Sequence, residues 1–229
     1  MKTLFATAAS VFVLGFAMPA MAQSSTSTSY QSGTGGQTID VNQIGGGAAN
    51  ISNAYQGYYD PSSHDNEITV DQLGNGGTAN TSTAFQDGSS HIAKASQNGV
   101  NGVNNTSTIT QSGTDHYADV NQFGGGSGDS NGSTINQHGI HQSAEVIQAD
   151  LFNDNVSLID QYDKNNTARV EQGDLLGAPV DFNNNNISTI LQNGDGNDAQ
   201  VYQGGASVTS NISGVTQYGT DNSAIINQH

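Results

Sequence analysis

The residues best placed to do chemistry in this chain are side-chain amides that recur at fixed intervals. Sixteen glutamines fall into eight pairs, and in six of these pairs the two members are 11 residues apart. The pairs are Gln31/Gln43, Gln56/Gln72, Gln86/Gln97, Gln111/Gln122, Gln137/Gln148, Gln161/Gln172, Gln192/Gln203 and Gln217/Gln228. A carboxamide carries two N–H donors and one acceptor, so amides stacked about 4.8 Å apart can bond to their own copies. The pattern therefore predicts a hydrogen-bonded stack rather than a site that makes or breaks bonds.

A second set of amides and hydroxyls precedes the first glutamine of each pair. Asparagine stands six positions before it at Asn50, Asn80, Asn105, Asn131, Asn155, Asn186 and Asn211, with Ser25 in the opening repeat. Serine follows two positions later in every repeat, and then a small or aliphatic residue. The second half of each repeat has the same spacing, with an amide or histidine, an apolar residue, an aliphatic residue and glutamine. Its aliphatic residues are expected to be Val41, Val70, Ala95, Val120, Val146, Val170, Val201 and Ile225.

These side chains alternate with residues of almost any type, which is the period of a β-strand, and each glutamine is expected to end its strand. Glycine or Asp163 lies two residues after the first glutamine of most pairs, where a turn needs a residue that tolerates positive φ. We therefore predict an all-β fold: a β-solenoid of eight strand–turn–strand repeats in two parallel, in-register sheets. Each such repeat is called a rung below, and the rungs start near residues 25, 50, 80, 105, 131, 155, 186 and 211. The sequence shows no helical period.

The two ends of such a stack are expected to be open. A solenoid exposes sheet edges at its first and last rungs, and repeat proteins usually cover them with an atypical segment. No such segment is evident in this sequence, and a long linker at 173–185 is expected to bulge from the side of the stack. We therefore expect Gln31 and Gln43 at one end, and Gln217 and Gln228 at the other, to be docking surfaces.

Residues 1–22 have the features of a secretory signal peptide: Lys2, an apolar run and an Ala20-Met21-Ala22 cleavage site. The repeat domain is then residues 23–229, exported and without membrane insertion. Removal of Lys2 changes the net charge from −16 to −17. So acidic a chain repels nucleic acid, which excludes nucleic-acid binding. The chain has no cysteine, so no disulfide can stabilise it.

Other residues admit a functional and a structural interpretation. Acidic outward positions in the second strands could bind cations, but we expect a solvated face that prevents lateral pairing. Tyr30, Tyr55 and Phe85 are expected to stack along the first sheet, which does not exclude an adhesive patch. His91 and His116 share an inward position and are expected to replace asparagine as hydrogen-bonding groups rather than to bind metal.

Three other functions receive little support from the sequence. The glycine- and aspartate-rich link at 125–129 is similar to calcium-binding nonapeptide solenoids, but the strict nine-residue period is missing. An ice-binding face would need a regular outward threonine array, and the threonines are interrupted. No nucleophile–base pair or phosphate loop is evident, so we expect a protein that is not an enzyme and has no catalytic, metal or cofactor site.

The spacing Gln-x-Gly-x2-Asn-x-Ala-x3-Gln, as in Gln192 to Gln203 and Gln217 to Gln228, resembles the curlin repeat. That repeat defines the subunits of curli, the extracellular amyloid fibres of bacterial biofilms, and the resemblance extends over residues 25–228. It implies a secreted subunit that polymerises with copies of itself. It also implies two partners, a nucleating subunit and an outer-membrane secretion channel.

From these observations we expect a structural subunit, most similar to the major subunit of curli. It should assemble end to end into extracellular, cell-surface fibres that serve the biofilm matrix and adhesion. Two alternatives remain open at this point. One is a minor, nucleating subunit, and the other is a surface adhesin or ligand-binding solenoid that does not polymerise.

Overall fold

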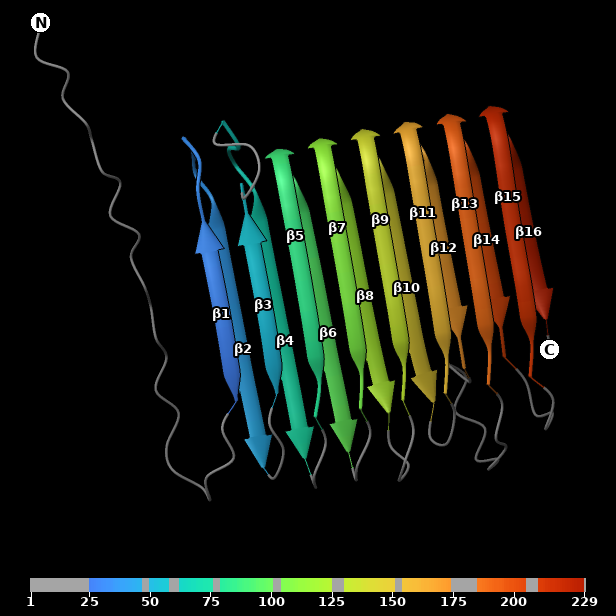
Figure 1. Cartoon of the computed structure of the whole chain (residues 1–229). Helices are drawn as coiled ribbons and strands as arrows, with labels where there is room; N and C mark the ends of the chain where they lie inside the picture. The colour runs from blue at the N-terminus through green and yellow to red at the C-terminus, as the bar shows by residue number, and fades with distance from the viewer. Residues whose placement is uncertain are drawn as a thin grey trace, which may run out of the picture.

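The chain forms two flat, parallel β-sheets that face each other, and the described residues contain no helix. The structure is a computed structural model that describes residues 25–46, 50–57, 62–75, 79–100, 104–124, 130–150, 154–173, 185–204 and 210–228. The predicted signal peptide, the 125–129 link and most of the 173–185 link lie outside these residues. The prediction of an all-β solenoid of eight stacked strand pairs is confirmed (Figure 1).

The odd-numbered strands form the first sheet, here called sheet A. They are β1 (Thr26–Gln31), β3 (Ile51–Gln56), β5 (Thr81–Ser89), β7 (Thr106–Thr114), β9 (Gly132–Ile140), β11 (Val156–Lys164), β13 (Ile187–Asp195) and β15 (Ile212–Thr220). The even-numbered strands form sheet B. They are β2 (Thr38–Gly46), β4 (Glu67–Asn75), β6 (Ile92–Val100), β8 (Tyr117–Gly124), β10 (Ser143–Asp150), β12 (Thr167–Gln172), β14 (Asp198–Gln203) and β16 (Ser223–Gln228).

Several strands run past the glutamine that was expected to end them, so this part of the prediction is wrong. In sheet B, β4 continues beyond Gln72, β6 beyond Gln97 and β8 beyond Gln122. The physical reason is that the residues after the glutamine still find a partner in register, as Gly74 does with Gly99. The expected strand ends hold for β1, β3, β12, β14 and β16, whose last residues are Gln31, Gln56, Gln172, Gln203 and Gln228.

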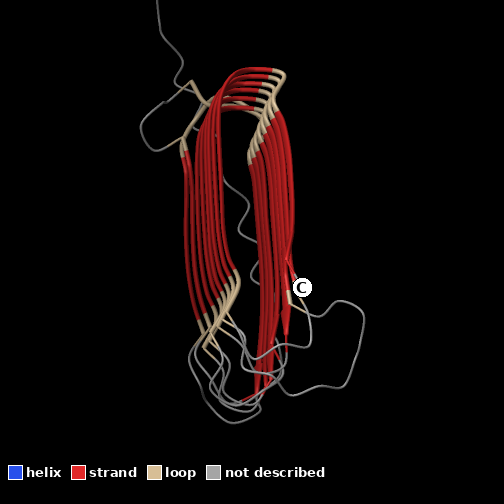
Figure 2. Cartoon of the chain, turned by 90° about the vertical axis from the view of Figure 1, so that its right-hand side faces the viewer, coloured by secondary structure: helices blue, strands red, loops and turns tan. Residues whose placement is uncertain are grey.

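Register is the same at every junction: each strand pairs with the equivalent strand of the next rung, residue on equivalent residue. Ser157 pairs with Ser133 on one side and Ser188 on the other, and Gln161 pairs with Gln137 and Gln192. Viewed along the stack, the rungs superpose as two layers joined by tight turns (Figure 2). A single register is enforced because a slip of one residue would turn every inward side chain outward.

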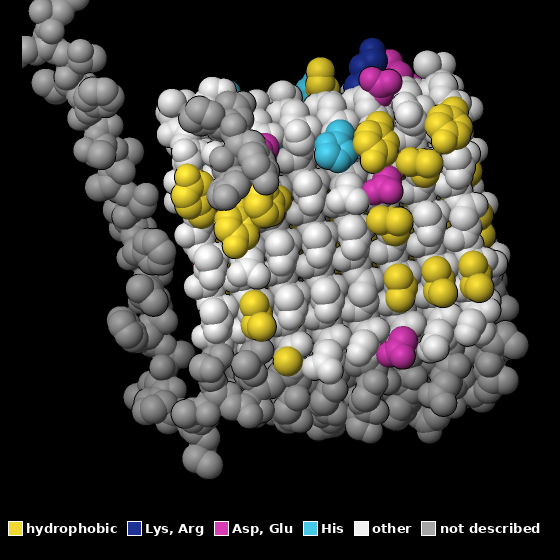
Figure 3. Space-filling view, viewed as in Figure 1, with side chains coloured by type: hydrophobic (Ala, Val, Ile, Leu, Met, Phe, Trp, Pro, Cys, Tyr) yellow, Lys and Arg dark blue, Asp and Glu magenta, His cyan; other side chains and the backbone are white. Residues whose placement is uncertain are grey.

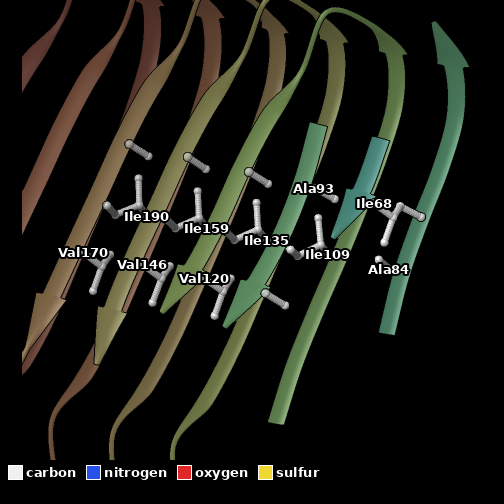
Figure 4. Packing of buried hydrophobic residues seen from close by; sticks show 14 of the residues in the cluster. Ile68, Ala84, Ala93, Ile109, Val120, Ile135, Val146, Ile159, Val170 and Ile190 are labelled. Atoms are coloured by element: carbon white, nitrogen blue, oxygen red, sulfur yellow. The ribbon is translucent and has the colours of Figure 1, made fainter. Parts of the chain in front are cut away.

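The core between the sheets is one narrow apolar row with amides on both sides of it. In rungs four to seven, isoleucine from sheet A packs against alanine and valine from sheet B, as Ile135 does with Ala144 and Val146 (Figure 4). In rung two the sizes are exchanged, with Ala54 opposite Ile68 and Val70. In these rungs a large side chain on one sheet faces smaller ones on the other, whereas rung three has only Ala84, Ala93 and Ala95.

One inward residue was assigned wrongly from the sequence. Ile225 was expected to fill the aliphatic position of the last rung, but its side chain is 60% exposed. The position belongs to Ile226, which pairs in register with Val201 and packs against the core. The strand period of two explains the correction, because Ala224, Ile226 and Gln228 must share the inner side.

The turns that join the two strands of a rung depend on left-handed backbone conformations. The glycine two residues after the first glutamine has positive φ, for example +118° at Gly139, and Asp163 takes its place with φ +77°. A second left-handed residue follows at Ser90, Asp115, His141, Asn165 and Asp221. Asparagine and aspartate tolerate this conformation better than other non-glycine residues.

Candidate functional site

The predicted glutamines form two unbroken hydrogen-bonded ladders along the stack. In sheet A, seven bonds of 2.9–3.0 Å join Gln31, Gln56, Gln86, Gln111, Gln137, Gln161, Gln192 and Gln217. In sheet B, seven bonds of 2.7–2.9 Å join Gln43, Gln72, Gln97, Gln122, Gln148, Gln172, Gln203 and Gln228. The structure thus brings all sixteen glutamines together.

Both ladders have one direction. In each bond the Nε2 of a rung donates to the Oε1 of the next rung along the chain, as Gln137 donates to Gln161. The first glutamine of each ladder therefore keeps an Oε1 that accepts from none of the described residues. The last one keeps one Nε2 hydrogen with no described acceptor. The two ends of the stack are thus chemically complementary.

Fifteen of the sixteen glutamines, all except Gln31, also tie the two sheets together, which the sequence reasoning missed. The second Nε2 hydrogen donates to a backbone carbonyl of the opposite sheet, as in Gln137 to Tyr117 at 2.9 Å and Gln148 to Gly132 at 3.0 Å. At the last rung, Gln217 donates to Asp198 and Gln228 to Ile212. Glutamine has the length to reach across the core, which is a signal available in the sequence.

The buried glutamines of sheet B therefore have a carbonyl partner in addition to their neighbours in the ladder. Gln72 donates to the carbonyl of Ile51 at 2.9 Å, Gln97 to that of Thr81 at 2.9 Å and Gln122 to that of Thr106 at 3.0 Å. The Gln122 Nε2 also lies 3.0 Å from the carbonyl oxygen of Asn131. Since Nε2 has two hydrogens and three acceptors there, one hydrogen of Gln122 is shared.

The asparagine column is less regular than the glutamine ladders. Its bonds run toward the N-terminal end, and the donor is a backbone N–H to Asn50 and Asn80 but a side-chain N–H to Asn105, Asn131 and Asn155. Asn211 does not join it, contrary to the prediction, and the buried Asn186 Oδ1 has no hydrogen-bond partner among the described residues.

The inward serines contribute size rather than hydrogen bonds. The Oγ atoms of Ser52, Ser82, Ser107, Ser133, Ser157, Ser188 and Ser213 are buried and have no described partner. Adjacent strands lie about 4.8 Å apart, which exceeds the roughly 3.0 Å reach of a hydroxyl hydrogen bond. The longer asparagine, glutamine and histidine side chains can bridge that gap.

A third column closes the turns at the start of sheet B. Asn66, His91, His116 and Asn197 accept a backbone N–H from the next rung, through Oδ1 of the asparagines and Nδ1 of the histidines. The other ring nitrogen of His91 and His116 lies 3.1 and 3.0 Å from the carbonyls of Asp87 and Ser112. Both histidines replace asparagine, as the sequence predicts.

Burial lowers the pKa of both histidines, because the interior disfavours the charged imidazolium. The pKa of His116 falls to about 4, mainly through burial, while a backbone carbonyl and Asp115 oppose the shift. The pKa of His91 is lowered by the same main cause. The described residues contain no cluster of histidines and carboxylates that could hold a metal ion. These two rings are therefore neutral hydrogen-bonding groups at pH 7.

Outside the core, two of the aromatic side chains that were expected to stack do so, and the cations of sheet B contact neighbouring side chains. Tyr55 and Phe85 stack with ring centroids 4.6 Å apart. Arg169 pairs with Glu145 across the rungs and with Glu171 along its own strand. Lys94 lies opposite Asp119 in register but sets its Nζ 5.7 Å from the centre of the Tyr117 ring.

Both ends of the stack are open in the described chain. β1 and β2 pair only with β3 and β4, and β15 and β16 only with β13 and β14. Gln31 is exposed, whereas its interior counterpart Gln137 is fully buried. The four predicted docking glutamines belong to β1, β2, β15 and β16, which are the outer strands of the two sheets (Figure 1).

Searches of protein-family models, of curated proteins and of solved structures find no match to this chain. The part of the chain that the structure describes has no helix long and apolar enough to cross a membrane.

Proposed function

We propose that this protein is a secreted structural subunit that assembles end to end into extracellular, amyloid-like fibres. The observation that carries the proposal is the complementarity of the two open ends. Gln217 and Gln228 offer N–H donors at one end, and Gln31 and Gln43 offer acceptors at the other. The strand edges beside them have no described partner.

Head-to-tail addition follows from this arrangement. A second molecule placed with its β1 and β2 on β15 and β16 continues both parallel sheets in register. Gln217 then donates to the Gln31 of the incoming chain, and Gln228 to its Gln43. Such addition of strands to an exposed edge is a general mode of protein association. Identical side chains stacked across the joint stabilise it further.

The resemblance to the curlin repeat supports the same function and adds its setting. A curli-like role places the fibre in a biofilm matrix. It also implies a nucleating subunit and an outer-membrane secretion channel as partners. Within this proposal a nucleating role for the chain itself is the second candidate, because each open end could template a different subunit.

Size-exclusion chromatography of the desalted chain from Gln23 onward, followed over a day, tests polymerisation directly. We expect the monomer peak to decline as fibres form, with diffraction near about 4.7–4.8 Å and ~10 Å. Chelation of divalent ions should leave the rate unchanged. A chain that stays monomeric would favour the non-polymerising adhesin, and a calcium requirement would overturn cofactor-free assembly.

A further inference from the structure

The two outer faces of the solenoid differ sharply in charge. On sheet A, we define the neutral face as the residues that flank each inward serine and the residue before each inward glutamine. Asp160 is the single charged residue among them, and it accepts a hydrogen bond from Asn136 at 2.7 Å. The equivalent outward positions of sheet B carry seven carboxylates and two cations, including Asp40, Glu67 and Lys94.

The neutral face also exposes apolar groups in rows that run along the stack. Val156, Ile187 and Ile212 occupy one register position in three successive rungs, with 47%, 39% and 67% of their surface exposed. Tyr55 and Phe85 form a stacked pair at the other end of the sheet. Figure 3 shows this face as mostly uncharged, with charges concentrated along its upper rim.

We propose that the neutral face is a lateral interface, on which a second copy of this chain packs with its own neutral face. This inference rests on the proposed function, since fibres present the face as a continuous strip. Two sheet B faces brought together would oppose their carboxylates, and a mixed pairing would remove those carboxylates from water. In a contact between two neutral faces, the only charged side chain of the face that is removed from solvent is Asp160.

The size of the neutral face suits such contact. Eight rungs at about 4.8 Å give a length of about 38 Å, and its three columns cover about 20 Å of strand. Their product, about 760 Å² per partner, matches the roughly 800 Å² that each side of a stable protein interface buries. In a fibre this area is repeated in every subunit, so weak contacts accumulate along its length.

Cysteine cross-linking tests the interface, because the chain has no native cysteine to interfere. Thr108→Cys places a thiol on the neutral face, and Ser96→Cys is the matched control on sheet B, since both side chains are half-buried. Fibres are treated with a bis-maleimide that spans about 10 Å, the separation of packed sheets. After denaturation, dimers are measured on a gel. Neighbours along one fibre lie about 38 Å apart, so only lateral contact yields dimers.

We expect several-fold more dimer from Thr108→Cys than from Ser96→Cys. Thr108→Glu should also separate bundled fibres into single ones by electron microscopy, while Ser96→Glu should leave bundles intact. Equal dimer yields, or a larger yield from Ser96→Cys, would overturn the interface. The interface would also be overturned if the Thr108→Cys thiol formed no dimer and a neutral polysaccharide protected that thiol from reaction with maleimide. Failure to form fibres at all would instead refute the proposed function.

Discussion

The rings of His91 and His116 lie parallel in adjacent rungs, with centroids 4.8 Å apart and an interplanar angle of 1°. Each Nδ1 accepts a backbone N–H from the next rung, at 3.3 Å. Protonation of Nδ1 would place its new N–H against the backbone N–H that it now accepts. Protonation of both rings would also stack two positively charged imidazolium groups. The rungs that contain these rings are therefore the acid-sensitive part of the stack.

The pH dependence has a definite sign. Burial lowers the pKa of His116 from 6.5 to about 4 and that of His91 in the same direction. The unfolded chain thus binds more protons than the folded chain below pH 6.5. The free energy of unfolding that depends on neutral His91 and His116 is therefore fully present above pH 6.5 and is lost as the pH falls toward 4. Nearby Asp115 opposes the shift at both rings, and His138 adds to it at His116.

Urea unfolding of the monomer at several pH values between 5 and 7, roughly spanning this window, measures the effect. The midpoint should fall on acidification. In the control with His91→Asn and His116→Asn, the slope should be much smaller, because asparagine accepts the same N–H at Asn66 and Asn197. Equal slopes for the two proteins would show that the histidines do not cause the acid sensitivity.

A charge placed at one end glutamine tests the direction of the ladder. Gln217→Glu replaces the Nε2 donor that should bond to the next molecule with an oxygen, so two acceptors meet at the joint, and it also removes the bond to the carbonyl of Asp198 in the same chain. Gln31→Glu keeps the acceptor at the joint and loses only the bond to Gln56 inside the same chain. A buried polar group left unpaired costs about 1–3 kcal/mol. A cost of 2 kcal/mol corresponds to about thirty-fold in docking affinity.

Seeded elongation, followed by thioflavin fluorescence with seeds of the same variant, should be much slower for Gln217→Glu than for Gln31→Glu. Gln217→Ala with Gln228→Ala should likewise slow elongation more than the interior pair Gln137→Ala with Gln148→Ala. Equal defects at the two ends would contradict head-to-tail docking. A larger defect from the interior pair would mean that rung folding limits assembly.

Substitution of Gly139 and of Gly219 distinguishes an effect on folding of the monomer from an effect on docking of the next molecule. A Cβ on Gly139 would lie 1.9 Å from the carbonyl oxygen of Asp163 in the next rung, whereas at Gly219 the nearest atom is Asn222 Nδ2 at 3.8 Å. Both glycines have positive φ, +118° and +99°. Gly219→Ala should cost the monomer only the conformational penalty of about 1–2 kcal/mol. Gly139→Ala should cost about 2–5 kcal/mol, because overpacking is added.

In a fibre, the carbonyl of the incoming Gly33 would take the place above Gly219 that Asp163 holds above Gly139. Gly219→Ala should therefore give a monomer that folds, by circular dichroism and urea unfolding, but elongates poorly. Normal elongation of this variant would show that the C-terminal rung is not the docking surface. Gly139→Ala serves as the folding-defective control.

Salt should accelerate assembly at pH 7. The full chain has a formal net charge of −16, which the predicted removal of Lys2 would change to −17, and repulsion between copies slows their encounter. Moderate salt screens such charges beyond about 8–10 Å. Lag times should shorten with sodium chloride, and the His91→Asn, His116→Asn variant should respond equally, since its net charge at pH 7 is unchanged. Lag times that do not depend on salt would show that charge repulsion does not limit the rate of assembly.

Export should remove the first 22 residues. The cleavage site Ala20-Met21-Ala22 predicts a mature protein that begins at Gln23. Intact-mass measurement of protein recovered outside the cell checks this prediction. A mass that still includes residues 4–17 would contradict the predicted signal peptide.

Periodicity made most of this fold predictable from one sequence. Every inward position except that of Ile226 follows from the glutamine spacing, because a strand in a stack has one register and two faces. The second left-handed turn residue and the carbonyl bonds across the core, such as that of Gln122, were missed. Both depend on how the two sheets face each other, and no residue pair close in sequence encodes that distance. The missing bond between Asn186 and Asn211 was not predicted either, because the spacing of the two asparagines is the same as in the other rungs.

The single direction of the glutamine ladders has an electrical consequence. Each amide is a dipole, and dipoles aligned head to tail add, as peptide dipoles do in a helix. The described ladders leave N–H groups at the rung of β15 and β16 and carbonyl oxygens at the rung of β1 and β2. In a fibre that continued them, the glutamine ladders would contribute a partial positive charge at one tip and a partial negative charge at the other. The asparagine column, whose bonds run the opposite way, would reduce this difference. The two tips would then grow at different rates and attract different ions, so that the fibre inherits a direction from the order of its amino acids.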